Sequence, residues 1–350
     1  MITYSKLKLD FHKNPEQQFL IIYTGGTIGM RVNEEGQLVP FNFEQFVDLV
    51  PELKQFKHNF TIFSFNELID SADMTPDHWI AIADCIAENY HLFDGFIVLQ
   101  GTDTMAYAAS GVSFLLENVK KPIIFTGAQL PIGAIRNDAR KNLISSIDIA
   151  AQRKNGEPIV QEVTIFFDEI LIRGTRSRKV QSNHLDAFQS ENYPELAHAG
   201  VFLEFNELAL TKSTGAFRGY SKLCREVSLL KFYPGINGSD IEATLSRPNL
   251  KGLVIETFGA GNASTNDSLI AELDKFIKRG GVIINVSQCD GGQVVQKLYQ
   301  TGNKLDKIGV ISGKDMTAES ALAKLMFVLG NFRGSEVSKN LAVSLRGEMS

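Results

Sequence analysis

The sequence predicts an α/β fold with two domains: a larger N-terminal domain built on a mostly parallel sheet and a smaller C-terminal parallel α/β domain. Three observations predict it. The 350-residue chain exceeds the roughly 250–300 residues at which one hydrophobic core stops growing. Short apolar runs alternate with amphipathic helical segments along the chain. The apolar runs are continuous, as expected for parallel strands that are buried on both faces.

Five strand-like runs account for the N-terminal domain. They are Phe19–Tyr23, Asn59–Phe65, Gly95–Leu99, Pro122–Thr126 and Val163–Phe167. A helix is predicted after Thr75-Pro76-Asp77, which offers a capping hydroxyl, a proline in the first turn and an acid at the positive end of the dipole. A second helix is predicted from about Asn137 to Arg153.

Residues 205–222 lack sustained periodicity and are interpreted as a linker between domains 1–204 and 223–350. Strand-like runs recur beyond the linker at Leu253–Ile255, Val282–Ile284 and Gly309–Ile311. Amphipathic helices are predicted at Asp267–Arg279, which the pair Gly280-Gly281 ends, and at Ala318–Leu329.

The bulk composition excludes several classes of protein. With 44% hydrophobic and 21% charged residues, it is ordinary for a soluble globular chain. A net charge of -5 gives no electrostatic footprint for nucleic acid or anionic membranes. The start of the chain lacks the apolar centre of a signal peptide. The three cysteines are scattered, so neither a disulfide framework nor a zinc site is indicated. We therefore expect a cytoplasmic protein without a metal and without nucleic-acid or membrane partners.

Polar loops lie at or near the ends of the predicted strands, which is where open α/β sheets bind their ligands. These loops begin Thr24-Gly25-Gly26, Ser71-Ala72-Asp73, Gly101-Thr102-Asp103 and Thr126-Gly127-Ala128. The first is neither G-x-G-x-x-G nor a P-loop, so it gives no specific support for a nucleotide. Each loop also has a simpler interpretation when taken alone. The first is equally explained as a tight turn, and Asp103 as a cap for a helix that starts near Met105.

Conventional hydrolase signatures are missing from the sequence. There is no G-x-S-x-G elbow, and the six histidines are interpreted as lying in helices or polar loops. A reactive hydroxyl would then need another assisting group, and a lysine can serve when its environment lowers its pKa. The run Arg173–Lys179 (RGTRSRK) offers one, although a solvated basic loop is an equally simple interpretation of that run.

Taken together, these loops resemble the L-asparaginase family, and specifically its bacterial type I, cytoplasmic branch. The motifs that carry the resemblance occur in the family's order and span nearly the whole chain. They are TGGTIGM (24–30), DSADMTP (70–76), QGTDTMAY (100–107), TGAQLP (126–131), RGTRSRK (173–179), FGAGN (258–262) and SQC (287–289).

The resemblance implies hydrolysis of L-asparagine to L-aspartate and ammonia, with weaker action on L-glutamine. It implies that Thr24 is the nucleophile that forms a β-aspartyl ester, and that Thr102, Asp103 and Lys179 form a second catalytic cluster. The implied substrate-binding residues are Asp70, Ser71, Ala72, Gly101, Thr102, Asp103 and Asn262. Asn262 resembles a residue that reaches a neighbouring subunit's site, so a homodimer or tetramer is expected. No cofactor is implied.

The sequence departs from the family pattern at three places. Gln100 stands where a histidine usually precedes Gly-Thr-Asp-Thr. The stretch 30–41, which corresponds to a mobile lid, has no tyrosine to hydrogen-bond the nucleophile. Asp290-Gly291-Gly292 also varies from the common form.

Two other functions fit parts of the pattern. The amidase subunit of a tRNA-dependent amidotransferase shares the fold but carries an extra N-terminal domain, for which the position of Thr24 leaves no room. A catalytically weak amino-acid-binding or sensing protein would fit Gln100 and the lid without a tyrosine.

Overall fold

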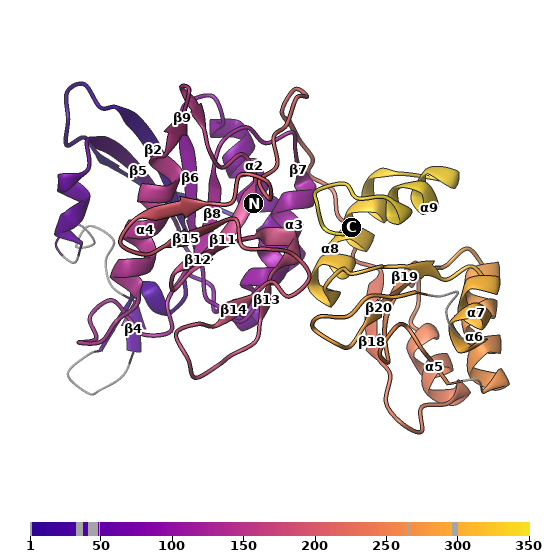
Figure 1. Ribbon diagram of the computed structural model, residues 1–350. Coiled ribbons are helices and arrows are strands. Elements are labelled where there is room, and N and C mark those ends of the chain that lie inside the picture. The colour runs from indigo at the N-terminus through magenta and orange to yellow at the C-terminus, as the bar shows by residue number, and fades with distance from the viewer. Residues whose placement is uncertain (1, 33–37, 41–47, 49, 265, 296–299) are drawn as a thin grey trace. The chain divides into compact units, whose positions relative to one another are not determined.

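The computed structural model describes residues 2–32, 38–40, 48, 50–264, 266–295 and 300–350 (Figure 1). The chain divides into two compact units. Unit 1 comprises residues 1–190 and 194–221, and unit 2 comprises residues 191–193 and 222–350. No helix in the described part of the chain is both long and apolar enough to cross a membrane.

Unit 1 is built on a nine-stranded sheet with the order β1-β5-β2-β6-β8-β11-β12-β15-β16. Its strands are β1 (Tyr4–Leu9), β2 (Gln17–Tyr23), β5 (His58–Phe65), β6 (Gly95–Leu99), β8 (Ile123–Thr126), β11 (Val163–Phe167), β12 (Ile170–Arg173), β15 (Ala197–Ala199) and β16 (Leu203–Phe205). The five central strands, from β5 to β11, pair in parallel, and the remaining pairings are antiparallel.

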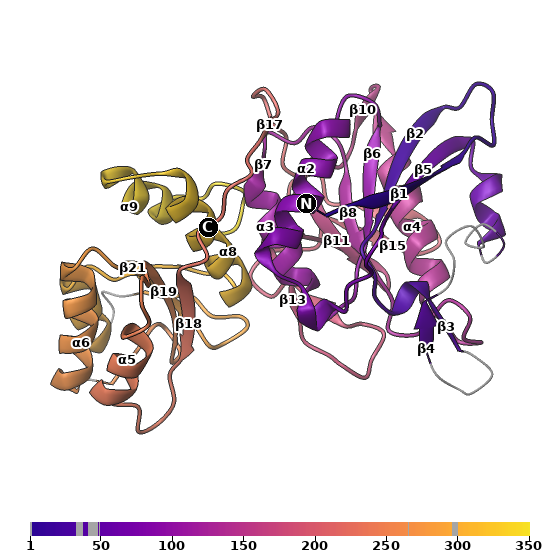
Figure 2. The same ribbon diagram turned by 180° about the vertical axis from the view of Figure 1, so that it is seen from behind.

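Burial explains why the central strands read as continuous apolar runs. Every residue of β5, β6, β8 and β11 is buried. The helices α2 (Pro76–Asn89) and α3 (Met105–Leu115) lie on one side of this sheet and α4 (Ala139–Ala151) on the other (Figures 1 and 2). Unit 1 therefore has the mostly parallel, helix-covered sheet that the sequence predicts.

Short elements complete unit 1. The 3₁₀ turns are η1 (Thr27–Gly29), η3 (Pro51–Gln55), η4 (Ser71–Asp73) and η5 (Gly174–Arg176). The short strands pair as β3 (Met30–Val32) with β4 (Leu38–Pro40), β7 (Leu116–Glu117) with β17 (Arg218–Gly219), β9 (Arg153–Lys154) with β10 (Glu157–Pro158), and β13 (Arg178–Lys179) with β14 (Phe188–Gln189). Within the predicted lid, residues 33–37 and 41 lie outside the described residues.

Unit 2 contains a four-stranded parallel sheet with the order β18-β19-β20-β21. The strands are β18 (Val227–Lys231), β19 (Gly252–Thr257), β20 (Val282–Ser287) and β21 (Ile311–Ser312), and the helices are α5 (Gly238–Leu245), α6 (Asp267–Lys278), α7 (Gln300–Lys307), α8 (Ala318–Asn331) and α9 (Ser335–Ala342). The core of this unit includes buried side chains of α5, β19, α6 and β20, among them Ile241, Ile255, Leu273 and Ile283. The prediction of a smaller parallel α/β domain is confirmed.

The segment 163–173 differs from a single extended strand. β11 and β12 form an antiparallel hairpin that turns at Asp168, whose φ of 57° is in the left-handed region. Aspartate tolerates that region because its short side chain can hydrogen-bond locally. Because the hairpin reverses the chain, residues 173–179 start near the amino ends of the parallel strands and not near their carboxyl ends.

Candidate active site

The carboxyl ends of the parallel strands β5, β2, β6 and β8 lead into the loops that carry the candidate residues. Glycines bring these loops into backbone contact. A Cβ at Gly25 would collide with the Ile69 carbonyl oxygen, and one at Gly26 would collide with the backbone of Gly101. Both glycines also have positive φ, 129° and 89°. Only glycine allows this close approach with this backbone conformation.

Thr24 is fully buried at the end of β2. Its hydroxyl donates to the Leu99 carbonyl at 3.1 Å, and its backbone N–H donates to the same oxygen at 3.0 Å. Its own carbonyl accepts the Ile69 N–H at 2.9 Å. Thr24 is thus held between the end of β6 and the loop that follows β5, with its hydroxyl hydrogen-bonded to a backbone acceptor.

Lys179 joins the two other candidate catalytic groups. Its Nζ donates to Thr102 Oγ1 at 2.7 Å and to Asp103 Oδ1 at 2.6 Å. The lysine side chain is only 16% exposed, whereas the Asp103 carboxylate is 64% exposed. Asp103 does not cap the following helix, because Thr104 occupies the N-cap of α3. The helix-cap interpretation of Asp103 is therefore wrong.

Lys179 reaches this cluster by a route that the sequence did not indicate. After β12, the turn η5 packs against α3, and both the Ser110 and Ser177 hydroxyls donate to the Gly174 carbonyl, at 3.2 and 2.8 Å. Residues 173–177 are all buried. The interpretation of this run as a solvated basic loop is wrong, because its backbone and side chains are packed inside unit 1.

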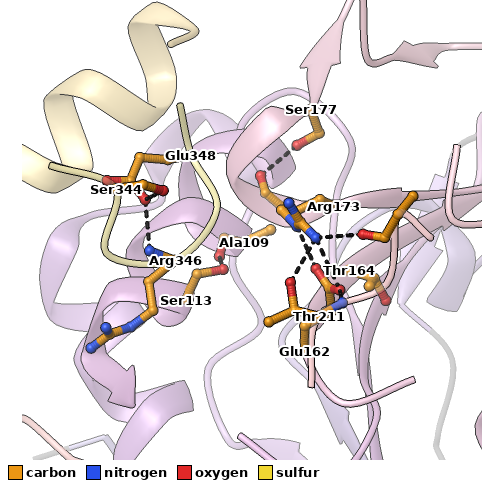
Figure 3. A network of polar contacts seen from close by, with 12 residues as sticks. Ala109, Ser113, Glu162, Thr164, Arg173, Ser177, Thr211, Ser344, Arg346 and Glu348 are labelled. Carbon is orange, nitrogen blue, oxygen red and sulfur yellow. Dashed lines mark hydrogen bonds and ion pairs between the residues drawn. The ribbon is translucent and has the colours of Figure 1, made fainter. Parts of the chain in front are cut away.

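Arg173 anchors the start of that run (Figure 3). Its guanidinium forms a buried ion pair with Glu162 at 2.6 Å and also donates to the Ala209 carbonyl at 2.8 Å and to Thr211 Oγ1 at 2.7 Å. A buried guanidinium with this many acceptors is well compensated for its loss of hydration. Arg173 therefore holds the start of the segment that ends at Lys179.

Gln129 is a site residue to which the sequence analysis assigned no role. Its amide nitrogen donates to the carbonyls of Ser182 and His184, at 3.2 and 3.0 Å, and its amide oxygen accepts the Thr102 hydroxyl at 3.2 Å. The Thr102 hydrogen is thereby directed to Gln129, which leaves the oxygen's lone pairs to Lys179. The signals in the sequence were the place of Gln129 in the loop after a predicted strand and its membership of the motif TGAQLP (126–131).

The candidate substrate-binding residues after β5 form the one-turn helix η4. The Asp70 carboxylate accepts the Ala72 N–H at 2.9 Å, and both residues are exposed. Ser71 is buried against Gly101, where an added Cβ would lie 2.7 Å from Ser71 Oγ. Residues Asp70, Ser71, Ala72 and Gly101 therefore lie together, beside the cluster of Thr102.

A cavity of about 570 Å³ adjoins Asp70 on the same loop. Glu67, Asp73 and His78 also line it, but Thr24, Thr102 and Lys179 do not. Burial lowers the pKa of His78, against the opposing effect of the carboxylates of Asp77 and Glu67. This cavity therefore shares one residue, Asp70, with the candidate site.

Gln100 and the histidines add two further findings. Gln100 is buried, and neither its amide oxygen nor its amide nitrogen has a hydrogen-bond partner among the described residues. His58 and His198 lie in the strands β5 and β15, so the interpretation that places all histidines in helices or polar loops is wrong for these two. In the described part of the chain, no three His, Cys, Asp or Glu side chains form a group that could hold a metal ion.

Asn262 belongs to unit 2 and closes a tight turn after β19. Phe258 and Asn262 exchange backbone hydrogen bonds of 2.9 and 2.8 Å across this turn. Gly259 and Gly261 have positive φ, 48° and 93°, which the turn requires. The other candidate residues all belong to unit 1, so Asn262 is described only within its own turn.

Comparisons with known proteins identify relatives of the whole chain. Residues 18–209 match the family model for the N-terminal asparaginase domain, and residues 226–341 match the glutaminase/asparaginase C-terminal domain. The L-asparaginase 1 of Escherichia coli K12 is 38% identical over 338 residues, which cover 95% of this chain and 98% of that protein. The 60 kDa lysophospholipase of Mus musculus is 40% identical over 96% of this chain and 63% of its own length. The crystal structure of L-asparaginase I from Vibrio cholerae is 40% identical, has a TM-score of 0.87, and matches over 95% of this chain and 99% of its own.

Proposed function

This chain belongs to the asparaginase family, and from that membership we propose that it is an L-asparaginase, which hydrolyses L-asparagine to L-aspartate and ammonia. The observation that carries the proposal is that Lys179 Nζ donates to both Thr102 Oγ1 and Asp103 Oδ1. The loop that contains Thr102 and Asp103 is packed against the loop of Thr24. We propose weaker action on L-glutamine, and a cytoplasmic location.

In the first step, Thr24 Oγ1 attacks the side-chain amide carbon of L-asparagine. The new C–O bond forms, the C–N bond breaks, and the departing nitrogen takes the hydroxyl proton, so that ammonia leaves and a β-aspartyl ester remains. In the second step, water attacks this ester, and one of its protons returns to Thr24 as L-aspartate is released. The threonine hydroxyl is too weak an acid to ionise near neutrality, so a neighbouring group must assist each proton transfer.

The cluster of Thr102, Asp103 and Lys179 is the proposed assisting group. In its neutral form the Lys179 amine can take the proton that the attacking nucleophile or water passes on through the Thr102 hydroxyl, since a hydroxyl oxygen alone is too weak a base to hold it. Gln129 accepts the Thr102 hydroxyl hydrogen and thereby holds the threonine oxygen toward Lys179. Backbone N–H groups of the glycine-flanked loops are the candidates to stabilise the oxyanion, and one such donor is typically worth about 10²–10³ in rate.

The charges around this cluster suit a zwitterionic α-amino acid. The exposed Asp103 carboxylate complements the substrate's α-ammonium group, and the segment Asp70–Ala72 with Gly101 complements its α-amino and α-carboxylate groups. We propose that Asn262 reaches the active site of a neighbouring subunit, which makes the functional protein a homodimer or a tetramer.

Ammonia release from L-asparagine tests the proposal, with Thr24→Ala as the decisive variant. We expect the wild-type protein to release ammonia and Thr24→Ala to lose this activity, because no hydroxyl is left to form the ester. Thr27→Val, in the same loop, is the matched control and should remain active. Substantial turnover by Thr24→Ala would contradict the assignment of the nucleophile, whereas an inactive wild-type protein would contradict the activity itself.

A further inference from the structure

Thr104 opens α3 but does not cap it. A threonine at the N-cap ordinarily accepts a backbone N–H of the first turn, and that bond stabilises the helix. Thr104 makes no such side-chain bond. Its hydroxyl donates instead to the backbone carbonyl of Ser71, at 2.7 Å and 33 residues away in the chain. The side chain that could stabilise its own helix therefore connects two loops of the site.

Ser71 lies in a turn with few bonds of its own, in which the Asp70 carboxylate accepts the Ala72 N–H and the Asp70 carbonyl accepts the Asp73 N–H, both at 2.9 Å. It begins the three-residue turn η4, where its carbonyl also accepts the Met74 N–H at 3.3 Å. Its side chain is buried against Gly101, and the flanking Asp70 and Ala72 are exposed. Isolated turns of this length are marginal, so the turn depends on contacts from outside it. Gly101 and Thr104, on either side of Thr102 and Asp103, supply two such contacts.

We propose that Thr104 is a positioning residue, which sets the place of the Ser71 turn relative to Asp103 and thereby the affinity for the substrate's α-ammonium and α-carboxylate groups. This inference rests on the proposed function. It divides the Gly-Thr-Asp-Thr motif into two tasks. Thr102 and Asp103 contact Lys179, and Thr104 holds the Ser71 turn.

Removal of the hydroxyl tests the proposal. Thr104→Val keeps the shape of the side chain and loses its hydrogen bond, and Thr104→Ser keeps the hydrogen bond. We expect the KM for L-asparagine, and the Kd of L-aspartate measured by calorimetry, to rise about three- to tenfold in Thr104→Val, the weight of one net hydrogen bond. The kcat should change less than about twofold, because the reacting groups are untouched, and Thr104→Ser should restore wild-type affinity.

Thr164→Val is the matched control. Thr164 is buried in β11 and also donates to a backbone carbonyl, that of Ile123 at 3.4 Å, at the start of β8 and thus at the end of the strands away from the site. It should leave KM and Kd unchanged. The positioning role would be overturned if Thr104→Val kept the wild-type KM and Kd. It would also be overturned if kcat fell about three- to tenfold while KM stayed unchanged. If Thr104→Val does not fold, Thr104→Ala and Thr104→Ser make the same comparison.

The two proposals fail in different ways. A wild-type protein that neither hydrolyses L-asparagine nor binds L-aspartate overturns the proposed function. A wild-type protein that does both, with a Thr104→Val variant that behaves identically, overturns only the role of Thr104.

Discussion

Two lysine–carboxylate pairs of this chain have nearly the same length and opposite surroundings. Lys179 and Asp103 in unit 1 are 2.6 Å apart, and Lys324 and Glu348 in unit 2 are 2.7 Å apart. The Asp103 side chain is 64% exposed, whereas both side chains of the second pair are completely buried. The N–O distance of an ion pair therefore does not indicate its role, and the other partners of the two side chains have to be compared.

Backbone groups supply most of the further partners of the buried pair. Lys324 Nζ also donates to the carbonyls of Leu341 and Val343, at 3.0 and 2.6 Å. The Glu348 carboxylate accepts the N–H groups of Leu345 and Arg346, at 2.9 and 2.6 Å, and Figure 3 shows Glu348 with Ser344 and Arg346. The Ser344 hydroxyl also donates to the Glu348 carboxylate, at 3.4 Å, but among the described residues no hydroxyl contacts the Lys324 amine. The pair ties residues 341–348 to α8.

Accessibility and the nature of the third partner separate the proposed catalytic pair from the buried structural one. The Lys179 amine also donates to the Thr102 hydroxyl, and the carboxylate of its partner Asp103 faces solvent, where a ligand can reach it. Loss of the first pair should therefore remove activity, and loss of the second should remove stability.

The largest expected effect is the loss of activity in Lys179→Met. We expect kcat for L-asparagine to fall at least about 10³-fold, or roughly 4 kcal/mol of transition-state stabilisation, because Thr102 loses the group that polarises it. Steady-state ammonia release measures it. Thermal unfolding should change little, because one end of the pair is already hydrated.

Lys141→Met is the control for this change. Lys141 is also in unit 1 and pairs with Asp168 and Glu169 at the surface, at 3.2 and 2.9 Å. Its replacement should leave activity within about twofold of wild type. An active Lys179→Met variant would break the comparison, since the exposed pair would then have no catalytic part.

A smaller effect, on stability, is expected from Lys324→Met. Removal of one member of a buried pair leaves an uncompensated charge and typically costs about 3–5 kcal/mol, and here two backbone carbonyls also lose a donor. We expect faster hydrogen exchange in peptides from α8 and α9, and earlier unfolding in urea. Lys278→Met, which removes a surface pair of 2.6 Å on α6, should cost less than about 1 kcal/mol. Equal stability of the two variants would contradict a structural task for Lys324.

Much of the fold could be predicted because its signals are local. The runs Phe19–Tyr23 and Gly95–Leu99 are buried on both faces, so composition alone indicates parallel strands. The helices α6 and α8 begin within a residue of their predicted starts. Not predicted were the edge strand β1 and the hairpin of β11 and β12, because antiparallel edges carry weaker patterns and a turn at Asp168 has no glycine to mark it. The domain limits 1–204 and 223–350 stay a prediction.

The candidate site was predictable only in part. The threonine loops stand at strand ends, where sheet topology brings them together. The contact between Lys179 and Thr102 spans 77 residues and depends on the packing of η5 against α3, which no local pattern encodes. The contact of Gln129 with Thr102 likewise depends on the loop 182–184, so it could be found only in the structure.

The smallest expected effect is the acid sensitivity of the buried pair. Burial alone would raise the pKa of Glu348, but the Lys324 ammonium and the N–H groups of Arg346 and Leu345 outweigh it and hold the pKa below its ordinary value. A carboxyl group with a lowered folded-state pKa stabilises fully above its unfolded pKa, about 4.3, and this contribution is lost as the pH falls through the folded pKa. On the acid side, the structural pair should therefore weaken as the pH falls below about 4.3.

Glu348→Gln isolates this contribution, because glutamine keeps the shape and one acceptor oxygen but cannot ionise. We expect wild type to be more stable than the variant at pH 7, by urea unfolding, and the difference to shrink steadily below about pH 4.3 as Glu348 itself becomes neutral. Asp267→Asn is the control, because Lys304 also lowers the pKa of Asp267, but the Asp267 side chain is 95% exposed. Its unfolding curve should follow wild type at every pH, since solvent screens that pair. The difference in stability between wild type and Glu348→Gln could instead stay constant from pH 7 to below the folded pKa. Glu348 would then stabilise unit 2 by its shape and not by its charge, and the contrast with Asp103 would rest on packing alone.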